Sequence, residues 1–300
     1  MTKTVKTCRE LRRYVRRVKR AGRTIGLVPT MGALHEGHLS LVRRSVAEND
    51  RTIVSIFVNP TQFAPGEDLA RYPRPLVRDV AACRAEKVNV VFAPTAEEVY
   101  PQGFTTTVQV EGLSKVLCGR SRPTHFRGVT TVCAKLFGLC EPDRAYFGEK
   151  DYQQLVVIRR MVADLNMTLE VVACPEVREP DGLAMSSRNK YLTTDERRQA
   201  PALYRSLMEA KRLVEEEGVT GVREITRAVR KVIRTAPAAK IDYVSVVHPE
   251  TLEALETIED EAVVAAAVYL GKARLIDNMK VKARVVLVDE KNRIVSKRKR

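Results

Sequence analysis

The sequence predicts an α/β protein in which a doubly wound parallel sheet is followed by a smaller α+β domain. Three observations support this class. Short apolar segments alternate with longer amphipathic ones through roughly the first 190 residues. Two amphipathic segments then follow each other directly, and strand-like segments come after them. A chain of 300 residues is also longer than one compact core usually needs, which favours two domains.

The N-terminal region begins with an arginine-rich helix over residues 7–21, which Gly22 ends. Buried strands are predicted over residues 24–28, 51–58, 88–93, 106–110, 144–147 and 168–173, with the principal helices over 38–48, 75–87, 128–139 and 151–165. Strands that alternate with helices imply right-handed crossovers and a parallel sheet covered on both faces. We therefore expect a Rossmann-like domain over residues 1–186.

The pattern changes near residue 190. A helix is predicted over 194–218, with Thr193 or Thr194 as its cap and acidic residues in its first turn, and a second helix over 222–235. Strands are predicted over 241–247, 262–269, 274–276 and 281–288. We expect a smaller α+β domain over residues 187–290 and a basic tail over 291–300.

Composition excludes two broad classes. Apolar residues make up 44% and charged residues 30%, the balance of a soluble globular chain. The longest apolar run, residues 262–270, is nine residues, about half of the ~20 that a membrane-spanning helix requires. The N-terminus is charged from Lys3 onward and lacks the apolar stretch of a signal peptide. We therefore expect neither an integral membrane protein nor a secreted one, and no membrane partner.

The net charge of +15 is concentrated at the two ends of the chain. Residues 1–23 carry ten Lys or Arg and one Glu, residues 291–300 carry six basic residues and no acid, and the span between them holds 36 of each sign. This neutral body has no tryptophan and is only 5% aromatic. We therefore expect no nucleic-acid partner. An RNA-binding protein that uses its basic ends remains a competing hypothesis.

The spacing of the cysteines indicates in which cellular compartment the protein is expected. Six are scattered through the chain without a CxxC pair. This spacing argues against a zinc site and against a disulfide framework, and it suits a reducing, cytoplasmic environment.

The segment PTMGALHEGH, residues 29–38, is the first candidate for chemistry. It joins the first predicted strand of the sheet to the next helix, where α/β sheets bind ligands. Gly32 and Gly37 let the backbone approach a ligand, and the amides at a helix start favour an anion. His35 and His38 are three residues apart, so both imidazoles can face one side. Together they could hold a triphosphate and donate hydrogen bonds to charge that develops at the α-phosphate.

Two other interpretations of this pair are surface histidines and metal ligands. A metal pair on a helix more often uses i, i+4 spacing with a carboxylate. The chain offers only two more histidines, His125 and His248, so phosphate chemistry is favoured and we predict no metal ligands from the protein. The acidic residues Glu67 and Asp68 could also suggest a metal site, but adjacent acids in a loop are usually solvated.

HxGH at this position resembles the signature of the nucleotidyltransferase superfamily, which includes class I aminoacyl-tRNA synthetases. Such enzymes carry a second phosphate-binding segment late in the fold. The segment MSSR, residues 185–188, fits that role, because two hydroxyls and a guanidinium suit the outer phosphates of ATP.

The resemblance narrows when more segments are included. Six of them resemble the pantoate–β-alanine ligase family, in the family's order: PTMGALHEGH (29–38), VNPTQF (58–63), EDLARYPR (67–74), PTHFRGVT (123–130), PDRAYFGEKDYQQ (142–154) and REPDGLAMSSRNKYL (178–192). The pattern covers residues 24 to about 192, and the C-terminal domain fits the family in size. The two basic ends do not match it.

This resemblance implies an ATP-dependent, AMP-forming ligase of pantothenate and coenzyme A biosynthesis. The family condenses (R)-pantoate with β-alanine to pantothenate, AMP and pyrophosphate through a pantoyl adenylate. It also implies Mg²⁺ on the triphosphate and a cytoplasmic homodimer. We expect water and phosphate oxygens to be most of the magnesium ligands. The alternative within the superfamily is another adenylate-forming or nucleotidyl-transferring enzyme with a different acceptor, against which the VNPTQF segment and its glutamine speak.

Roles for single residues follow from the resemblance. It assigns His38 as the proton donor, a choice that chemistry alone leaves open between His38 and His35, and Lys150 and Arg188 complete the expected catalytic set. Gln62 is placed on pantoate and beside β-alanine, and Gln154 on pantoate from the other side. ATP contacts are expected from Met31, Gly32, Ala33, Leu34, His35, Glu36, Gly37, His38, Gly148, Glu149, Lys150, Asp151, Val177, Met185, Ser186, Ser187 and Arg188.

Overall fold

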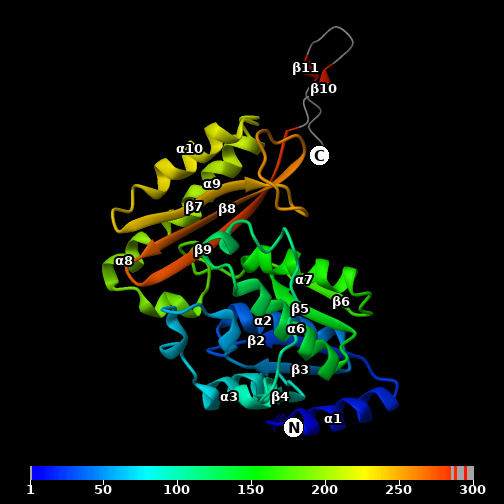
Figure 1. The fold of residues 1–300 in the computed structure, drawn as a ribbon. Coiled ribbons are helices and arrows are strands. Elements are labelled where there is room, and N and C mark those ends of the chain that lie inside the picture. The colour runs from blue at the N-terminus through cyan, green and yellow to red at the C-terminus, as the bar shows by residue number, and fades with distance from the viewer. Residues whose placement is uncertain (1, 285–286, 289–293, 296–300) are drawn as a thin grey trace. The chain divides into compact units, whose positions relative to one another are not determined.

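The computed structural model of the chain describes residues 2–284, 287–288 and 294–295. It contains two compact units, Met1–Lys190 and Tyr191–Arg300 (Figure 1). No helix in the described part of the chain is both long and apolar enough to cross a membrane.

The first unit is built on a six-stranded parallel sheet with the strand order β1-β4-β3-β2-β5-β6. Its strands are β1 (Lys3–Val5), β2 (Ile25–Thr30), β3 (Arg51–Ile56), β4 (Val90–Phe92), β5 (Arg144–Gly148) and β6 (Glu170–Cys174). β2 pairs with β3 along its whole length, from Ile25↔Arg51 to Thr30↔Ile56, and with β5 at Gly26↔Arg144 and Leu27↔Ala145. The chain therefore winds from β2 in one direction and from β5 in the other, so the two strands form the switch point of the sheet.

Helices connect these strands, as the sequence predicted. They are α1 (Cys8–Arg20), α2 (Glu36–Glu48), α3 (Leu76–Ala85), α4 (Ala96–Val99), α5 (Cys118–Ser121), α6 (His125–Cys140) and α7 (Tyr152–Asp164). Short 3-10 turns also occur at η1 (Pro60–Gln62), η2 (Asp68–Ala70), η3 (Glu149–Asp151) and η4 (Ser187–Tyr191). Local sequence sets where α1 begins, because Thr7 and Glu10 form a capping box at its start.

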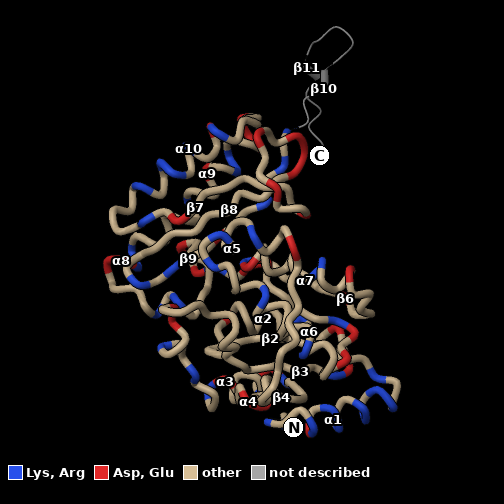
Figure 2. The backbone as a smooth tube through the Cα atoms, viewed as in Figure 1, with Lys and Arg blue, Asp and Glu red and all other residues tan. Residues whose placement is uncertain are grey.

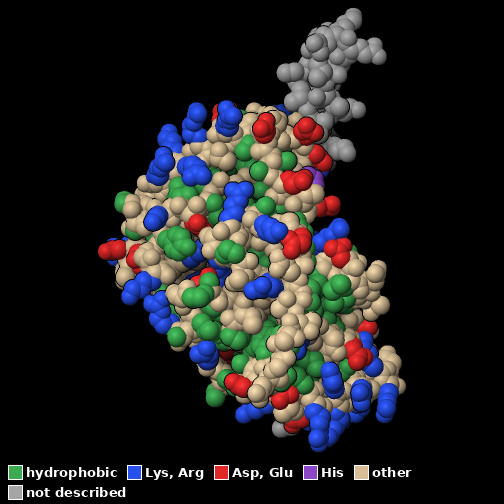
Figure 3. All heavy atoms as spheres, in the orientation of Figure 1, with side chains coloured by type: hydrophobic (Ala, Val, Ile, Leu, Met, Phe, Trp, Pro, Cys, Tyr) green, Lys and Arg blue, Asp and Glu red, His purple; other side chains and the backbone are tan. Residues whose placement is uncertain are grey.

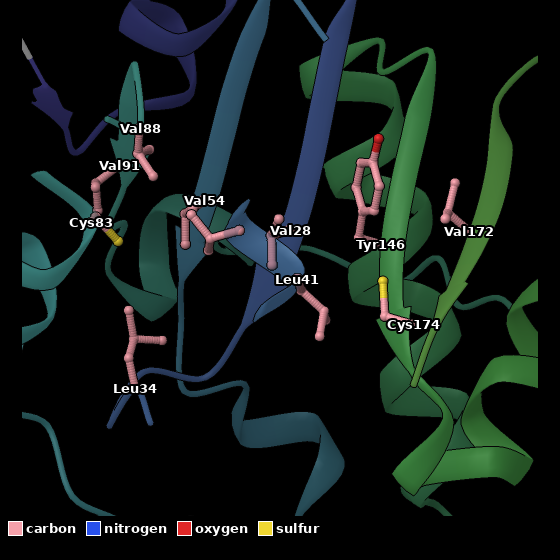
Figure 4. Packing of buried hydrophobic residues seen from close by; sticks show 11 residues of the cluster. Val28, Leu34, Leu41, Val54, Cys83, Val88, Val91, Tyr146, Val172 and Cys174 are labelled. Atoms are coloured by element: carbon pink, nitrogen blue, oxygen red, sulfur yellow. The ribbon is translucent and has the colours of Figure 1, made fainter. Parts of the chain in front are cut away.

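A continuous apolar layer lies between the sheet and the helices α2 and α3. Val28 of β2, Val54 of β3 and Tyr146 of β5 belong to one buried cluster with Leu41 of α2 and Cys83 of α3 (Figure 4). Burial of this kind contributes about 25 cal/mol for each Å² of apolar surface. The layer fixes the strand ends from which the loops discussed below emerge.

Two predictions in this unit are wrong at the level of single elements. Residues 106–110, expected as a strand, form no strand. Side chains of α6 satisfy their backbone instead: Thr131 Oγ1 accepts from the Val108 amide at 3.0 Å, and Thr130 Oγ1 donates to the Val108 carbonyl at 2.5 Å. The short edge strand β1 was not predicted. It pairs with β4 and has only three residues, too few for a periodic signal.

The excess charge of the N-terminal segment lies on α1. Its apolar residues Leu11, Val15 and Val18 are buried, whereas the six arginines of the helix are exposed. Figure 2 shows the basic positions along the backbone of α1, and Figure 3 shows basic side chains gathered there. Among the described residues, the ion pair of this helix is Lys19 with Asp143, at 2.8 Å. Asp143 also accepts from the Ile25 amide, which places the end of α1 at the amino ends of the strands.

The second unit consists of helices α8 (Thr194–Gln199), α9 (Ala202–Glu215) and α10 (Val222–Ile233) and an antiparallel sheet of the order β7-β8-β9. The strands are β7 (Ala239–Val247), β8 (Glu261–Leu270) and β9 (Ala273–Lys282). The single helix expected over 194–218 is instead two helices, because Pro201 lacks the amide that would continue the hydrogen-bond ladder.

The strands predicted over 274–276 and 281–288 also differ from the structure. Residues 273–282 form one continuous strand, β9. Two further short strands, β10 (Leu287–Val288) and β11 (Ile294–Val295), pair antiparallel. The rest of the second predicted strand beyond residue 284, and the rest of the tail over 291–300, lie outside the described residues.

Candidate active site

Most of the predicted site residues follow the carboxyl ends of β2, β3 and β5, and Val177 and the segment 185–188 follow β6 (Glu170–Cys174). We call residues 31–38, between β2 and the start of α2, the histidine loop. We call residues 60–74, after β3, the acidic segment. The third contributor is η3 (Glu149–Asp151), which follows β5 directly. Because β2 and β5 are neighbours at the switch point, segments more than a hundred residues apart in sequence meet there.

The histidine loop is anchored through its backbone. Thr30 Oγ1, at the end of β2, donates to the Ser55 carbonyl at 2.7 Å and accepts from the Gly32 amide at 3.1 Å. The next two amides, of Ala33 and Leu34, donate to the carboxylate of Asp79 at 2.8 and 2.9 Å. These bonds define the path of the chain up to the first residue of α2.

The two histidines lie against each other, as their spacing predicts. Their ring centroids are 4.1 Å apart. The His35 amide donates to His38 Nδ1 at 3.4 Å, so His38 accepts at Nδ1 and its proton is available at Nε2. His35 Nδ1 is buried and has no hydrogen-bond partner within the described part of the chain. The amides of Glu36 and Gly37 lie in the first turn of α2, where a helix provides no intrahelical acceptor, and neither has a partner among the described residues.

Both imidazoles are uncharged at neutral pH. Desolvation by burial, reinforced by the positive charge of Lys150, lowers the pKa of His35 to about 4. Desolvation and the neighbouring His35 lower the pKa of His38 to about 3. A neutral imidazole donates a hydrogen bond from one nitrogen without carrying positive charge. The pair can therefore supply directed N–H groups, while positive charge must come from other residues.

The charges of Lys150 and Asp151, both on η3, affect the pKa values of the two histidines. Both appear among the electrostatic influences on His35 and on His38. Desolvation would raise the pKa of Asp151, but the charges of Lys150 and Arg188 outweigh it and hold that pKa below its ordinary value. Asp151 is thus an ionised hydrogen-bond acceptor. These interactions place η3 in the electrostatic environment of the histidine loop, whereas the ATP contacts expected of residues 148–151 stay a prediction.

Arg188, on η4, is paired with the acidic segment. Its Nε and Nη2 atoms donate to the Asp68 carboxylate, each at 3.2 Å. Arg122 forms the second such pair, with Glu67, at 2.7 and 2.6 Å. The expectation that Glu67 and Asp68 are solvated is therefore wrong: each carboxylate meets an arginine that the chain brings from 55 and 120 residues away.

Ser187 and Met185, from the predicted phosphate-binding segment 185–188, also form contacts within the first unit. Ser187 is buried, and its Oγ lies 3.4 Å from the hydroxyl of Tyr72 in the acidic segment. The Met185 amide donates to the Val177 carbonyl at 3.1 Å. The Val177 carbonyl therefore already accepts a hydrogen bond within the protein. This limits the backbone groups that Val177 can offer to the adenine base of ATP.

Gln62 is buried and rigidly held. Asn59 Nδ2 donates to Gln62 Oε1 at 2.8 Å and to the Gly128 carbonyl at 3.0 Å. A Cβ added at Gly128 would lie 2.3 Å from the Thr61 carbonyl oxygen, so α6 packs backbone against backbone on η1. The orientation of Gln62 leaves its Nε2 amide, which has no partner among the described residues, for a ligand.

The two consecutive glutamines of α7 have different surroundings. Gln153 is buried and binds three backbone groups, of which the Cys118 amide is one. Gln154 is half-buried, and no hydrogen bond of its side chain lies within the described part of the chain. The structure thus uses Gln153 to support the fold, and the contact of Gln154 with pantoate stays a prediction.

Sequence reasoning missed four residues around this site: Asp79, Asn59, Arg122 and His125. His125 Nδ1 lies 2.9 Å from the Gln62 carbonyl oxygen and must donate to it, which leaves Nε2 as an acceptor. Desolvation lowers the pKa of His125 to about 4. A signal existed for Asp79, because it falls between Leu76 and Cys83 on the apolar side of its helix, where an acidic residue is unusual.

Comparisons with known proteins give a consistent family. The family model described as pantoate-beta-alanine ligase matches residues 3–280. The chain is 54% identical to the pantothenate synthetase of Acetivibrio thermocellus over 277 residues, covering 92% of this chain and 98% of the relative. It is also 54% identical to that of Moorella thermoacetica, over 92% of this chain and 97% of the relative.

Solved structures agree with this. The crystal structure of pantothenate synthetase from Thermus thermophilus matches with a TM-score of 0.88 and 50% identity, covering 92% of this chain and 98% of that one. Pantoate-beta-alanine ligase from Francisella tularensis, complexed with beta-gamma ATP and beta-alanine, matches with a TM-score of 0.77 and 34% identity, covering 93% and 97%.

Proposed function

This chain belongs to the pantoate–β-alanine ligase family, and we propose that the residues at the carboxyl ends of β2, β3 and β5 carry out the family's reaction in it. The chain is a ligase that uses ATP to join pantoate and β-alanine. The proposal concerns the route through an adenylate and the part of each residue. The observation that carries it is the neutral His35–His38 pair beside the free amides at the start of α2.

In the first step the pantoate carboxylate attacks the α-phosphorus of ATP, and the bond to the bridging oxygen of pyrophosphate breaks. Negative charge develops on the phosphoryl oxygens and on the leaving group. The amides of Glu36 and Gly37 and the Nε2–H of His38 would stabilise the charge at the α-phosphate. Because His38 starts neutral, it acts by hydrogen bonding, and the bound phosphates raise its basicity toward proton transfer.

Positive charge for the departing phosphates would come from Lys150 and Arg188. Arg188 suits a bidentate contact with phosphate oxygens, whereas Lys150 acts as a point charge. Both lie in the electrostatic environment of Asp151, for which we propose a contact with the ribose hydroxyls. Because Arg188 is bound to Asp68, phosphate must compete with that carboxylate.

In the second step the amine of β-alanine attacks the acyl carbon of pantoyl adenylate, and AMP leaves with the electron pair of the acyl–oxygen bond. Gln62 and Gln154 would hold pantoate by their amide groups, which offer both a donor and an acceptor to its hydroxyls. Support for Gln62 comes from its buried and fixed position beside Asn59. Fixed geometry of this kind raises the effective concentration of the reacting groups.

We include Mg²⁺ in the proposal as an ion carried by the triphosphate. Among the described residues no group of three or more His, Cys, Asp or Glu side chains is placed to hold a metal ion. That water and phosphate oxygens supply most of the magnesium ligands stays a prediction, based on the reluctance of Mg²⁺ to lose its water. Such an ion neutralises phosphate charge when it is bound.

A cytoplasmic homodimer completes the proposal. All six cysteines are free thiols, five of them buried, which is typical of proteins from reducing compartments. The dimer rests on the family resemblance, and light scattering of the purified chain tests it.

The function is tested by pyrophosphate release with ATP, pantoate and β-alanine, each omitted in turn. We expect release in a single turnover with ATP and pantoate alone, and sustained release only when β-alanine is added. Release without pantoate, or with other carboxylic acids at equal rates, would favour a different adenylate-forming enzyme of the superfamily.

A further inference from the structure

The buried carboxylate of Asp79 anchors the histidine loop. Asp79 of α3 is 1% exposed, and both of its oxygens accept hydrogen bonds from loop amides. Within the described residues it forms no ion pair with Lys, Arg or His. A buried carboxylate without a cation is costly. Strong, charge-assisted bonds to the amides of Ala33 and Leu34 are therefore the interactions that offset its burial.

The loop at this point takes a path that needs support. Gly32 and Ala33 both have positive φ, +80° and +52°. For alanine this left-handed conformation is unfavourable unless surrounding contacts enforce it. A Cβ at Gly32 would lie 3.0 Å from Asp79 Oδ2, so glycine permits the close approach of the carboxylate. Two residues after Ala33 comes His35, the cap residue of α2.

We propose that Asp79 is a positioning residue for the His35–His38 pair: its carboxylate holds the Ala33 and Leu34 amides and thereby sets where α2 begins and where both imidazoles lie. Asp79 belongs to a helix 45 residues further along the chain and touches neither imidazole in this arrangement. The catalytic part of this inference rests on the proposed function, whereas the anchoring of the loop does not.

Asp79→Asn is the principal variant, because it keeps the size of the side chain and replaces one acceptor oxygen with an N–H donor that faces an amide. Asp143→Asn is the matched control. Asp143 anchors the opposite, amino end of the same strand β2, where it accepts from the Ile25 amide at 2.6 Å and from Lys19 at 2.8 Å. Both variants weaken one anchor of β2, but only Asp79→Asn affects the histidine loop.

Two measurements are made on each variant. Hydrogen exchange of a peptide that covers residues 31–38, followed by mass spectrometry without substrates, reports on the loop. Single-turnover pyrophosphate release reports on adenylate formation, and the reaction of synthetic pantoyl adenylate with β-alanine reports on the second step.

For Asp79→Asn we expect loop exchange to accelerate about tenfold or more, because the amides lose an acceptor. Pyrophosphate release should slow about 10–100-fold, with less than about a threefold change in the second step, because misplacement of catalytic groups by about 1 Å has effects of this size. Asp143→Asn should show neither change. Unchanged loop exchange in Asp79→Asn, or equal acceleration in both variants, would overturn the proposal.

The design separates this inference from the proposed function. If the wild-type chain releases no pyrophosphate with ATP and pantoate, the proposed function fails, while the exchange experiment still decides whether Asp79 fixes the loop. If Asp79→Asn does not fold, Asp79→Glu replaces it. That variant keeps the charge but moves the carboxylate by one methylene, so loop exchange and pyrophosphate release should both lie measurably away from wild type. Wild-type values for both in Asp79→Glu would contradict a positioning role.

Discussion

The histidine loop and the acidic segment both contribute to the candidate site, but they are held in opposite ways. The loop is fixed by hydrogen bonds from its own backbone to the buried Asp79 and to Thr30. The acidic segment is held by side-chain ion pairs that remain partly exposed: the side chains of Asp68 and Arg188 keep 17% and 27% of their accessible surface.

The histidine loop and the acidic segment therefore contribute to the site in different ways. Backbone bonds to a buried carboxylate give a geometry that exists before a ligand arrives, which favours groups that must meet a transition state. The Asp68–Arg188 pair keeps part of its surface open to solvent, so an incoming anion can reach Arg188 and replace the carboxylate. The loop is therefore the preorganised region, and the acidic segment is the exchangeable one.

The largest expected effect comes from the preorganised region. His38→Ala and His35→Ala should each lower the rate of adenylate formation by about 10²–10³ while weakening ATP binding much less, because each removes a fixed donor that we propose lies near the α-phosphate. Single-turnover pyrophosphate release measures this, with His248→Ala, an exposed histidine of the second unit, as the control. Unchanged rates in both variants would remove the loop from the mechanism.

The cations beside the loop should matter for one step only. Arg188→Ala and Lys150→Ala should slow the first half-reaction about 10–100-fold, the effect of losing a charge-assisted contact of about 1.5–3 kcal/mol. Attack of β-alanine on supplied pantoyl adenylate should change less, because the outer phosphates have already left. Arg198→Ala removes an exposed cation of the second unit as a control. Equal defects in both half-reactions would contradict the assignment.

Gly128→Ala tests whether the anchored end of the acidic segment, η1, is preorganised like the loop. The new Cβ would overlap the Thr61 carbonyl and displace Gln62, so we expect KM for pantoate to rise about tenfold, in line with the usual ~1–3 kcal/mol cost of overpacking. Gly138→Ala in the same helix, where the new Cβ meets open space, is the matched control. If both variants raise KM equally, the close contact does not position Gln62.

The exchangeable region should respond in the opposite direction. Asp68→Asn removes the competitor for Arg188, so we expect KM for ATP to fall by a factor of about two to five, as suits a partly exposed ion pair. Glu67→Gln frees Arg122 instead and serves as the control, with a smaller effect on ATP. A rise in KM for ATP in Asp68→Asn would show that Asp68 orients Arg188 for phosphate and does not compete with it.

The buried histidines should also shape stability against pH. The pKa values of His35 and His38, about 4 and about 3 in the folded chain, lie below the ordinary 6.5, so the unfolded chain takes up protons first as the pH falls. Stability should therefore decrease as the pH is lowered from about 6.5 toward 4. The charged groups that act on the pair are Lys150, Asp151 and, for His35, Lys190. The pKa of His125 is also lowered, to about 4. This residue is present in the wild type and in the double histidine variant, so it changes the pH dependence of stability in the same direction in both.

Urea unfolding at about pH 7 and about pH 5 measures this dependence. The His35→Gln, His38→Gln double variant should lose less free energy of unfolding than wild type over that interval. Equal losses would mean that the pair is not desolvated in the folded chain.

Much of the fold follows from signals that act within a few residues. The alternation of buried strands and amphipathic helices, the capping boxes at Thr7 and Thr193 and the position of the histidines at a helix start are all local, so they can be predicted from the sequence. The short edge strand β1 and the lack of a strand over residues 106–110 could not be predicted, because β1 pairs with β4 and Val108 bonds to α6, and both partners are distant in the chain.

The sequence by itself determined the α/β class, the family resemblance and the types of residue in the candidate site. Only the tertiary structure decided how those residues are held. Asp79 meets Ala33 across 46 residues and Arg188 meets Asp68 across 120. Which buried carboxylate accepts from which amide, and which acid pairs with which arginine, depends on strand order and helix packing. No periodicity or local motif encodes those distances, because they exist only after the sheet has assembled.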